Sequence, residues 1–309
     1  MAELQDEISS LCDRIRDYKI GDFEKFHDAI EGEMEGCCIN IAVFGMTGSG
    51  KSALINTIFQ SLGYPKVAVI QSTGKEGTKV LESFVLPGKQ ITLFDTRGFF
   101  EMDFKEEGEL FRILNGIERP GDDLKRDEES ARKAKAAGQG AHKLEKPPIT
   151  DQMHVVLWVI KAIDIRFGLG QYREIIKYVQ DQLRETIITI LTVLTFDDEV
   201  QRNPNADEER KRLKEAAIKV TGSDMRNVFM IANPLPGKDL DPVYKERVLE
   251  LMEKALKCGE RSIRMRQTKR ESPKKQVRHS ECVASNLKYP TPVEHEDEPP
   301  IDRKYKCLP

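Results

Sequence analysis

The chain has 309 residues, of which 39% are hydrophobic and 33% are charged, and its formal net charge is −3. This length and composition fit one large folded domain, or two small ones, with some solvated segments beside the core. The near balance of acidic and basic residues argues against a protein that binds nucleic acid over its whole surface. Six cysteines without CxxC pairs or metal-ligand spacing argue against a disulfide framework and against a zinc site.

The N-terminus and the apolar runs predict where the protein resides. The start MAELQDEISS is acidic and lacks the basic and apolar regions of a signal peptide. The longest apolar run, TIITILTVLTF, has about half the length that spans a bilayer. We therefore expect a cytoplasmic protein without a transmembrane segment.

Residues 1–36 are predicted to form an amphipathic helical arm. Its apolar residues recur at alternating spacings of four and three, which places them on one face of a helix: Leu4, Ile8, Leu11, Ile15 and Tyr18. Such an arm packs on its own domain or docks on another subunit, and the pattern fits both.

From residue 37 onward, short apolar runs alternate with amphipathic helical patterns. The strands are predicted at 39–45, 80–86, 90–96, 154–160, 186–196 and 228–233, and the helices at 51–62, around 110–117, and at 172–183, 205–220 and 241–256. This alternation indicates a mainly parallel sheet with helices on both faces. The second and third strands, joined by PGK, are predicted to form a hairpin, so one strand is antiparallel. We therefore predict the α/β class, with a six-stranded sheet in a domain over 37–257.

Two segments do not follow this alternation. Residues 118–149 carry seven acids and eight bases and are predicted to form a flexible surface insertion. Residues 258–309 are predicted to form a disordered tail, first basic and then acidic. The basic run at 261–279 is compatible with contact to an anionic membrane or to RNA, and equally with a solvated linker.

The stretch GMTGSGKS matches the phosphate-loop pattern G-x-x-x-x-G-K-[ST] between a predicted strand and a predicted helix. Its glycines let the backbone wrap closely, so that N–H groups point at phosphate oxygens, and the helix N-terminus adds donors. Lys51 is expected to reach the β- and γ-phosphates, and the Ser52 hydroxyl to ligate Mg²⁺. The predicted nucleotide-binding residues are Gly45, Met46, Thr47, Gly48, Ser49, Gly50, Lys51 and Ser52.

A second motif, D-x-x-G, ends the predicted strand at 90–96. Asp95 is expected to hold the Mg²⁺ shell, and the Gly98 amide to meet the γ-phosphate. The threonine that closes over Mg²⁺ and the γ-phosphate has two candidates, Thr73 and Thr78. We favour Thr78 because it directly precedes the predicted strand at 80–86.

A third motif predicts the base. LTFDD ends the fifth predicted strand, where GTPases carry [NT]-K-x-D; Thr195 and Asp198 fit this pattern, but Phe196 replaces the lysine. Asp198 can accept from guanine N1–H and from the exocyclic amine, and such charge-assisted bonds contribute about 1.5–3 kcal/mol each. Adenine lacks this donor pair. Asn233, after the sixth strand, is a further residue expected to line the base.

With these motifs in order, the segment from about Ile39 to Leu256 resembles a P-loop GTPase domain of the translation-factor class. Within that class it resembles the interferon-induced protein 44 family and, more distantly, the immunity-associated (AIG1-type) GTPases. The closer resemblance rests on NIAVFGMTGSGKSALINTIF, on FDTRGF followed by FRILNGIERPGDDL, and on HVVLWVI followed later by ILTVLTFDD. It implies a three-layer G domain and a cytoplasmic protein of innate immunity that binds GTP and GDP with Mg²⁺.

The residue after Gly98 raises the question of hydrolysis. Small GTPases of the Ras type place a water-orienting glutamine here, and this chain has Phe99, which cannot orient water by hydrogen bonding. Arg97 is a candidate to neutralise developing charge, beside Lys51 and Thr78 as catalytic candidates. Two hypotheses follow: a GTPase that is slow unless a partner or self-association across the nucleotide face stimulates it, or a nucleotide-gated assembly protein with little hydrolysis.

Overall fold

The structure is a computed structural model that describes residues 2–22, 34, 36–70, 80–100, 104–122, 147–184, 186–235 and 237–284. The chain divides into two compact units, Met1–Gln267 and Thr268–Pro309. The fold and the candidate site described below belong to the first unit.

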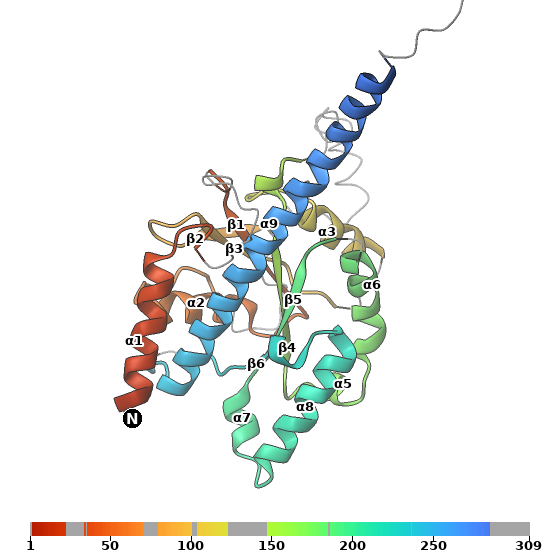
Figure 1. Cartoon of the computed structure of the whole chain (residues 1–309). Helices are drawn as coiled ribbons and strands as arrows, with labels where there is room; N and C mark the ends of the chain where they lie inside the picture. Colours follow the sequence, from red (N-terminus) through yellow and green to blue (C-terminus); the bar gives the residue numbers. More distant parts are fainter. Residues whose placement is uncertain are drawn as a thin grey trace, which may run out of the picture. The chain divides into compact units, whose positions relative to one another are not determined.

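The centre of this unit is a six-stranded sheet (Figure 1). Its strands lie in the order β2-β3-β1-β4-β5-β6, and only the β2–β3 pair is antiparallel. The central strands are apolar and buried on both faces, which is typical of parallel strands between helical layers. The strands are β1 (Ile39–Gly45), β2 (Glu82–Val85), β3 (Ile91–Asp95), β4 (Val155–Lys161), β5 (Thr189–Thr195) and β6 (Val228–Met230).

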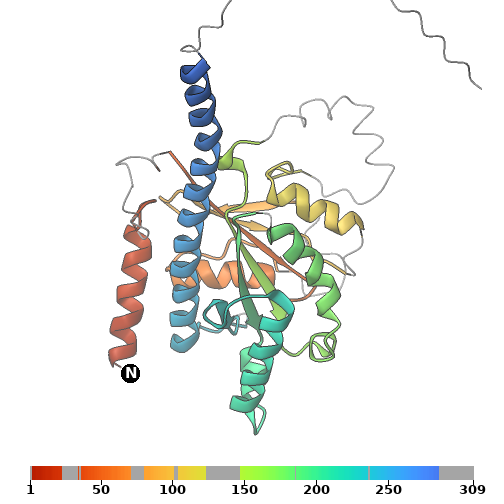
Figure 2. The same cartoon turned by 45° about the vertical axis from the view of Figure 1, so that its right-hand side comes forward.

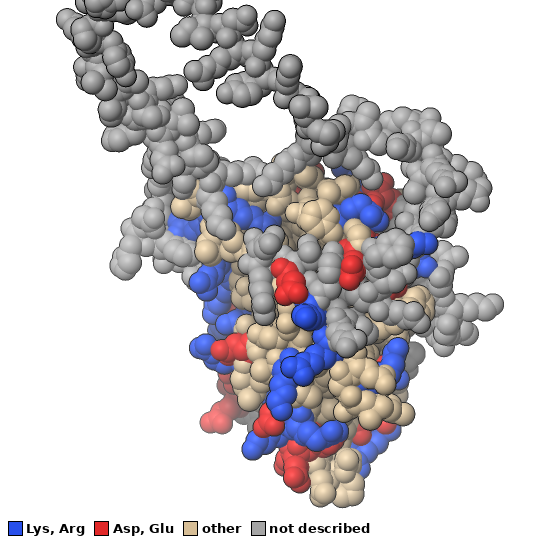
Figure 3. All heavy atoms as spheres, turned by 90° about the vertical axis from the view of Figure 1, so that its right-hand side faces the viewer, with Lys and Arg blue, Asp and Glu red and all other residues tan. Residues whose placement is uncertain are grey.

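Helices cover both faces of the sheet and enclose two separate hydrophobic cores (Figures 1 and 2). One core joins the sheet to α1, α2 and α9, and the other joins it to α3, α6 and α8. Figure 3 shows the side of the molecule that lies to the right in Figure 1. On its described part, acidic and basic side chains are interspersed among uncharged ones. The helices are α1 (Ala2–Asp17), α2 (Lys51–Ser61), α3 (Phe104–Leu114), α5 (Ile165–Gly168), α6 (Tyr172–Arg184), α7 (Asp197–Gln201), α8 (Ala206–Thr221) and α9 (Pro242–Ala284), with single 3₁₀ turns at η2 (Ile149–Asp151) and η3 (Met225–Asn227).

The predicted fold class is therefore confirmed: six strands, mainly parallel, with one antiparallel pair between two helical layers. Phe111 is 45% exposed, whereas Ile113 is fully buried, because α3 turns Leu110, Ile113 and Leu114 toward the sheet.

The N-terminal helix α1 packs on its own chain. The predicted apolar stripe is buried against α2 and α9 from Ile8 to Tyr18. Arg14 forms an ion pair with Glu253 of α9 at 3.3 Å, and the Tyr18 hydroxyl donates to buried Glu260 at 2.7 Å. These contacts support the first of the two interpretations of the arm.

The closing helix differs from the prediction. α9 continues past residue 257, so the prediction that a tail without regular structure begins at residue 258 is wrong up to Ala284. The physical reason is that apolar residues at helical spacing persist among the basic ones: Leu256 and Ile263, seven residues apart, are both fully buried. Arg266, within the predicted basic run, donates to the Met153 carbonyl at 3.0 Å.

Other predicted segments lie outside the described residues. These are most of the insertion at 118–149 and the C-terminal residues 285–309. In the part of the chain that is described, none of the helices combines the length and the apolar character needed to cross a membrane.

Candidate functional site

The carboxyl ends of four adjacent strands bring the predicted motifs together. β3 ends at Asp95, β1 at Gly45, β4 at Lys161 and β5 at Thr195. In open α/β sheets, ligands bind in the crevice at this edge. The sheet order therefore places the phosphate loop between the D-x-x-G turn and the base motif.

The phosphate loop connects β1 directly to α2. Gly50, the N-cap of α2, has φ 92°, a left-handed conformation that glycine adopts without steric cost. The Lys51 side chain is buried, and its ammonium donates to the carbonyl oxygens of Gly45 and Met46, both at 3.3 Å. The ammonium is thus folded back over the loop whose N–H groups are expected to hold phosphate.

Asp95 has the features of a cation ligand. Its Oδ2 accepts from the Ser52 hydroxyl at 2.5 Å, whereas its Oδ1 is buried and has no hydrogen-bond partner among the described residues. Burial raises the pKa of Asp95 to about 6, against the opposing effects of the Ser52 hydrogen bond and of Lys51. A buried carboxylate oxygen without a partner is costly unless a cation binds it, so Ser52 and Asp95 fit a Mg²⁺ ion.

The D-x-x-G turn lies directly against the phosphate loop. The Phe99 N–H donates to the Gly45 carbonyl at 3.2 Å, and the Thr47 N–H donates to the Phe99 carbonyl at 2.9 Å. A Cβ on Gly98 would lie 2.6 Å from the Thr47 Cα, so only glycine allows this approach. The two motifs are held together by backbone contacts that depend on Gly98.

The side chain of Phe99 belongs to the core. It is fully buried and stacks against both Phe44, at a ring-centroid distance of 5.8 Å, and Trp158, at 6.0 Å. The aromatic ring thus points away from the nucleotide edge, and the position of the Ras glutamine offers no polar side chain. The sequence shows the substitution but not this packing, because Trp158 lies on β4, far from Phe99 along the chain.

The remaining catalytic candidates are only partly described. Arg97 lies in the D-x-x-G turn and is partly buried. Thr73 and Thr78 lie outside the described residues. The assignment of the switch threonine therefore stays a prediction.

Two residues predicted to bind the nucleotide make contacts with the phosphate loop. The buried Thr195 hydroxyl donates to the Ser49 carbonyl at 2.7 Å. The Asn233 amide nitrogen lies 3.4 Å from the Gly50 carbonyl, and its oxygen accepts from Thr57 at 2.8 Å. These contacts join the base motif to the phosphate loop and give both residues a positioning role, while their contact with the base stays a prediction.

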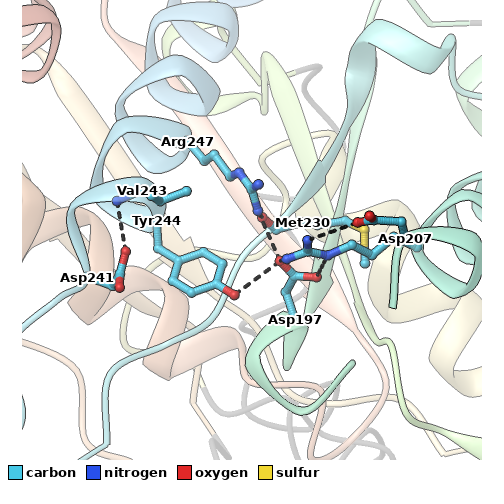
Figure 4. Close-up of polar contacts among 8 residues, drawn as sticks. Asp197, Asp207, Met230, Asp241, Val243, Tyr244 and Arg247 are labelled. Atoms are coloured by element: carbon cyan, nitrogen blue, oxygen red, sulfur yellow. Dashed lines mark hydrogen bonds and ion pairs between the residues drawn. The ribbon is translucent and has the colours of Figure 1, made fainter. Parts of the chain in front are cut away.

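The two adjacent acids of the base motif have different environments. Asp197 is fully buried and forms a bidentate ion pair with Arg210, and it also accepts from Tyr244 at 3.1 Å and from Arg247 at 3.0 Å (Figure 4). Its partners come from α8 and α9, so the carboxylate anchors the motif to both helices. Sequence reasoning missed this role because the arginines are distant along the chain.

Asp198 is placed differently, in the first turn of α7 and only partly buried. Within the described ranges, no side chain or backbone group pairs with its carboxylate. An unpaired carboxylate in the predicted base motif is available to the N–H groups of a guanine base. The buried neighbour Asp197 fixes the turn from which Asp198 projects.

Replacing Phe99 by glutamine tests the buried position of this side chain. Phe99→Gln is expected to lower the free energy of unfolding by about 3 kcal/mol, because it leaves a cavity and buries an amide. It should not raise the rate of GTP hydrolysis. Urea unfolding and phosphate release measure the two effects, and Phe100→Gln, at the 42% exposed neighbour, is the control. Faster hydrolysis with unchanged stability would show that residue 99 faces the nucleotide.

Many solved structures resemble the fold at low identity. One of them comes from a study of the chloroplast translocon components atToc33 and psToc159; it is 16% identical, the match covers 84% of this chain and 91% of that chain, and the TM-score is 0.45. A second is the small COPII coat GTPase SAR1 from Encephalitozoon cuniculi with GDP; it is 11% identical, the match covers 87% of this chain and 92% of that chain, and the TM-score is 0.40. A third is a GTP-binding protein from Sulfolobus solfataricus with GDP; it is 16% identical, the match covers 72% of this chain and 52% of that chain, and the TM-score is 0.35. No curated protein sequence matches the chain, so the resemblance to the interferon-induced protein 44 family stays a prediction.

A protein-family model gives the assignment. The model described as 50S ribosome-binding GTPase matches residues 40–196, which is just over half of the 309-residue chain. The match includes the phosphate loop and the D-x-x-G turn and ends two residues before Asp198. The chain belongs to this family of GTPases and is a GTP-binding protein with a P-loop.

Proposed function

We propose that this protein binds Mg-GTP through its P-loop and hydrolyses it slowly unless a partner or self-association stimulates it. The burial of Phe99 against Phe44 and Trp158 is the observation that carries this proposal. Without a polar side chain at this position, the chain has no group there to orient an attacking water. Stimulation by an arginine from a partner accelerates GTPases by about 10³–10⁵.

The proposed roles of the site residues follow from their contacts. Lys51 stabilises the phosphates, and Ser52 and Asp95 hold Mg²⁺, which supplies charge neutralisation when it is bound. Asp198 accepts hydrogen bonds from guanine. Arg97 is the candidate within this chain for stabilising the developing charge.

Self-association is the form of stimulation that we propose. The segment that follows β4 carries three exposed apolar side chains, Ile163, Ile165 and Leu169. Apolar side chains gathered on one short segment favour a protein contact over solvent. In the alternative function, the same contact would assemble a nucleotide-gated scaffold with little hydrolysis. The two functions differ in whether turnover per molecule rises with protein concentration.

Nucleotide titration tests the binding part of the proposal. Wild-type protein with Mg²⁺ is expected to bind fluorescent GTP and GDP analogues more tightly than the ATP analogue. Lys51→Ala should weaken binding of all three. Asp198→Asn should weaken GTP binding roughly tenfold to hundredfold and leave ATP binding unchanged, because it removes one or two charge-assisted hydrogen bonds to guanine.

Two other aspartates, Asp197 and Asp207, provide control variants for this titration. Asp197→Asn should lower the free energy of unfolding by about 3 kcal/mol, since it leaves two arginines without their shared carboxylate. Asp207→Asn, in the exposed first turn of α8, should change neither stability nor selectivity. Equal binding of GTP and ATP by the wild type, unaffected by Asp198→Asn, would contradict guanine specificity.

The pKa of Asp95 predicts how stability depends on pH when the cation is removed. Its folded pKa of about 6 lies above the ordinary value of 3.8, so the folded state binds this proton more tightly than the unfolded state. Stability from this group is therefore highest below about pH 4 and is lost as the pH rises through 6, by about 3 kcal/mol. In EDTA, Asp95→Asn should become more stable relative to wild type across this pH range.

Adding Mg²⁺ and GDP provides the matched comparison for Asp95. The cation should stabilise the ionised carboxylate, so the wild type should gain more stability from Mg²⁺ and GDP at pH 8 than Asp95→Asn does. Thermal unfolding at pH 4.5 to 8 measures both differences. The same stability difference between the two proteins at every pH, with and without Mg²⁺, would contradict the cation-binding role of Asp95.

A further inference from the structure

The motif lysine that Phe196 replaces has a counterpart on the neighbouring strand. The Lys161 ammonium lies over the Phe196 ring, 4.9 Å from its centroid. A cation at this distance is attracted by the negative face of the ring. The chain therefore brings a lysine ammonium and an aromatic ring together at the position where a GTPase base motif has one lysine.

The sheet register places Lys161 at the nucleotide edge. Lys161 is the last residue of β4 and pairs with Thr195, the last residue of β5. The Thr195 hydroxyl in turn contacts the phosphate loop through the Ser49 carbonyl, at 2.7 Å. Lys161 is thus one strand away from the base motif and at the same level along the sheet.

The charge of Lys161 is not neutralised by the nearby acids. No hydrogen bond or ion pair involves its ammonium within the described residues. Asp164, three residues later, is paired with Arg166 at 2.8 Å and accepts from Tyr172 at 2.8 Å. Asp197 is paired with two arginines. The ammonium is therefore available to an acceptor on a ligand.

The Phe196 backbone is held in place by the contacts of the residue that follows it. Phe196 has φ 64°, and it is the only residue other than glycine with positive φ in the described part of the chain. A bulky side chain adopts this conformation only where its surroundings hold it. Asp197, directly after it, donates its N–H to the Ile231 carbonyl and carries the buried ion pairs. The ring is thus presented from a fixed turn.

We propose that Lys161 and Phe196 together replace the lysine of the guanine-recognition motif. The Phe196 ring provides the apolar cover over the nucleoside, and the Lys161 ammonium provides the positive charge toward nucleoside oxygens. Lys161 is then a nucleotide-binding residue that the linear motif does not contain. This inference rests on the proposed GTP binding and names a further residue of the same site.

Removing the lysine at position 161 and restoring one at position 196 tests the proposal. Lys161→Met removes the charge but keeps most of the stem, and it is expected to weaken GTP and GDP binding about fivefold to tenfold. Lys161→Arg keeps the charge and should stay within about twofold of the wild type. Adding Phe196→Lys to Lys161→Met restores the motif lysine and should recover most of the lost affinity. Lys177→Met, at an exposed lysine of α6, is the control.

The measurements are titrations with fluorescent GTP and GDP analogues, together with thermal unfolding of each nucleotide-free variant. Lys161→Met affinity within twofold of wild type would overturn the proposal, as would a folded double variant that binds no better than Lys161→Met. If Phe196→Lys prevents folding, the proposal is tested by the difference in nucleotide affinity between Lys161→Arg and Lys161→Met. Wild-type GTP binding that Lys51→Ala abolishes shows that the proposed function stands even where the Lys161 inference fails.

Discussion

The site depends on the contact between the phosphate loop and the D-x-x-G turn. Phe99 holds this contact from the core side, where its ring packs against Phe44 of β1 and Trp158 of β4. Its backbone holds the contact from the loop side, through hydrogen bonds with Gly45 and Thr47. Residue 99 thus fixes the phosphate loop through both its ring and its backbone, and its buried side chain is not available to position water.

The base motif is tied to the phosphate loop by a second group of contacts. Thr195 and Asn233 contact carbonyl oxygens of the loop, and Asp197 connects the motif to α8 and α9. The predicted phosphate loop and the predicted base motif are thus joined by one set of buried and partly buried polar groups. Such groups stabilise a unique arrangement only when all of them have partners, which holds for the Asp197 carboxylate.

The strands and the phosphate loop could be predicted from the sequence because their signals are local. Each strand is a short apolar run, and the loop is a contiguous pattern between a strand and a helix. The packing of Phe99, the pairing of Asp197 and the position of Lys161 depend on strands and helices that are distant along the chain. The length of α9 was underestimated because basic residues obscured the apolar positions around Ile263.

The most direct test of this account is the rate of phosphate release per molecule, measured with GTP and Mg²⁺ over about a hundredfold range of protein concentration. The account predicts a rate that is low in dilute solution and rises with concentration, because Phe99 leaves the isolated site without a residue to orient water. A rate that is high at the lowest concentration and constant thereafter would contradict it, since the isolated chain would then position water by itself. A rate near zero at every concentration would contradict stimulation by self-association.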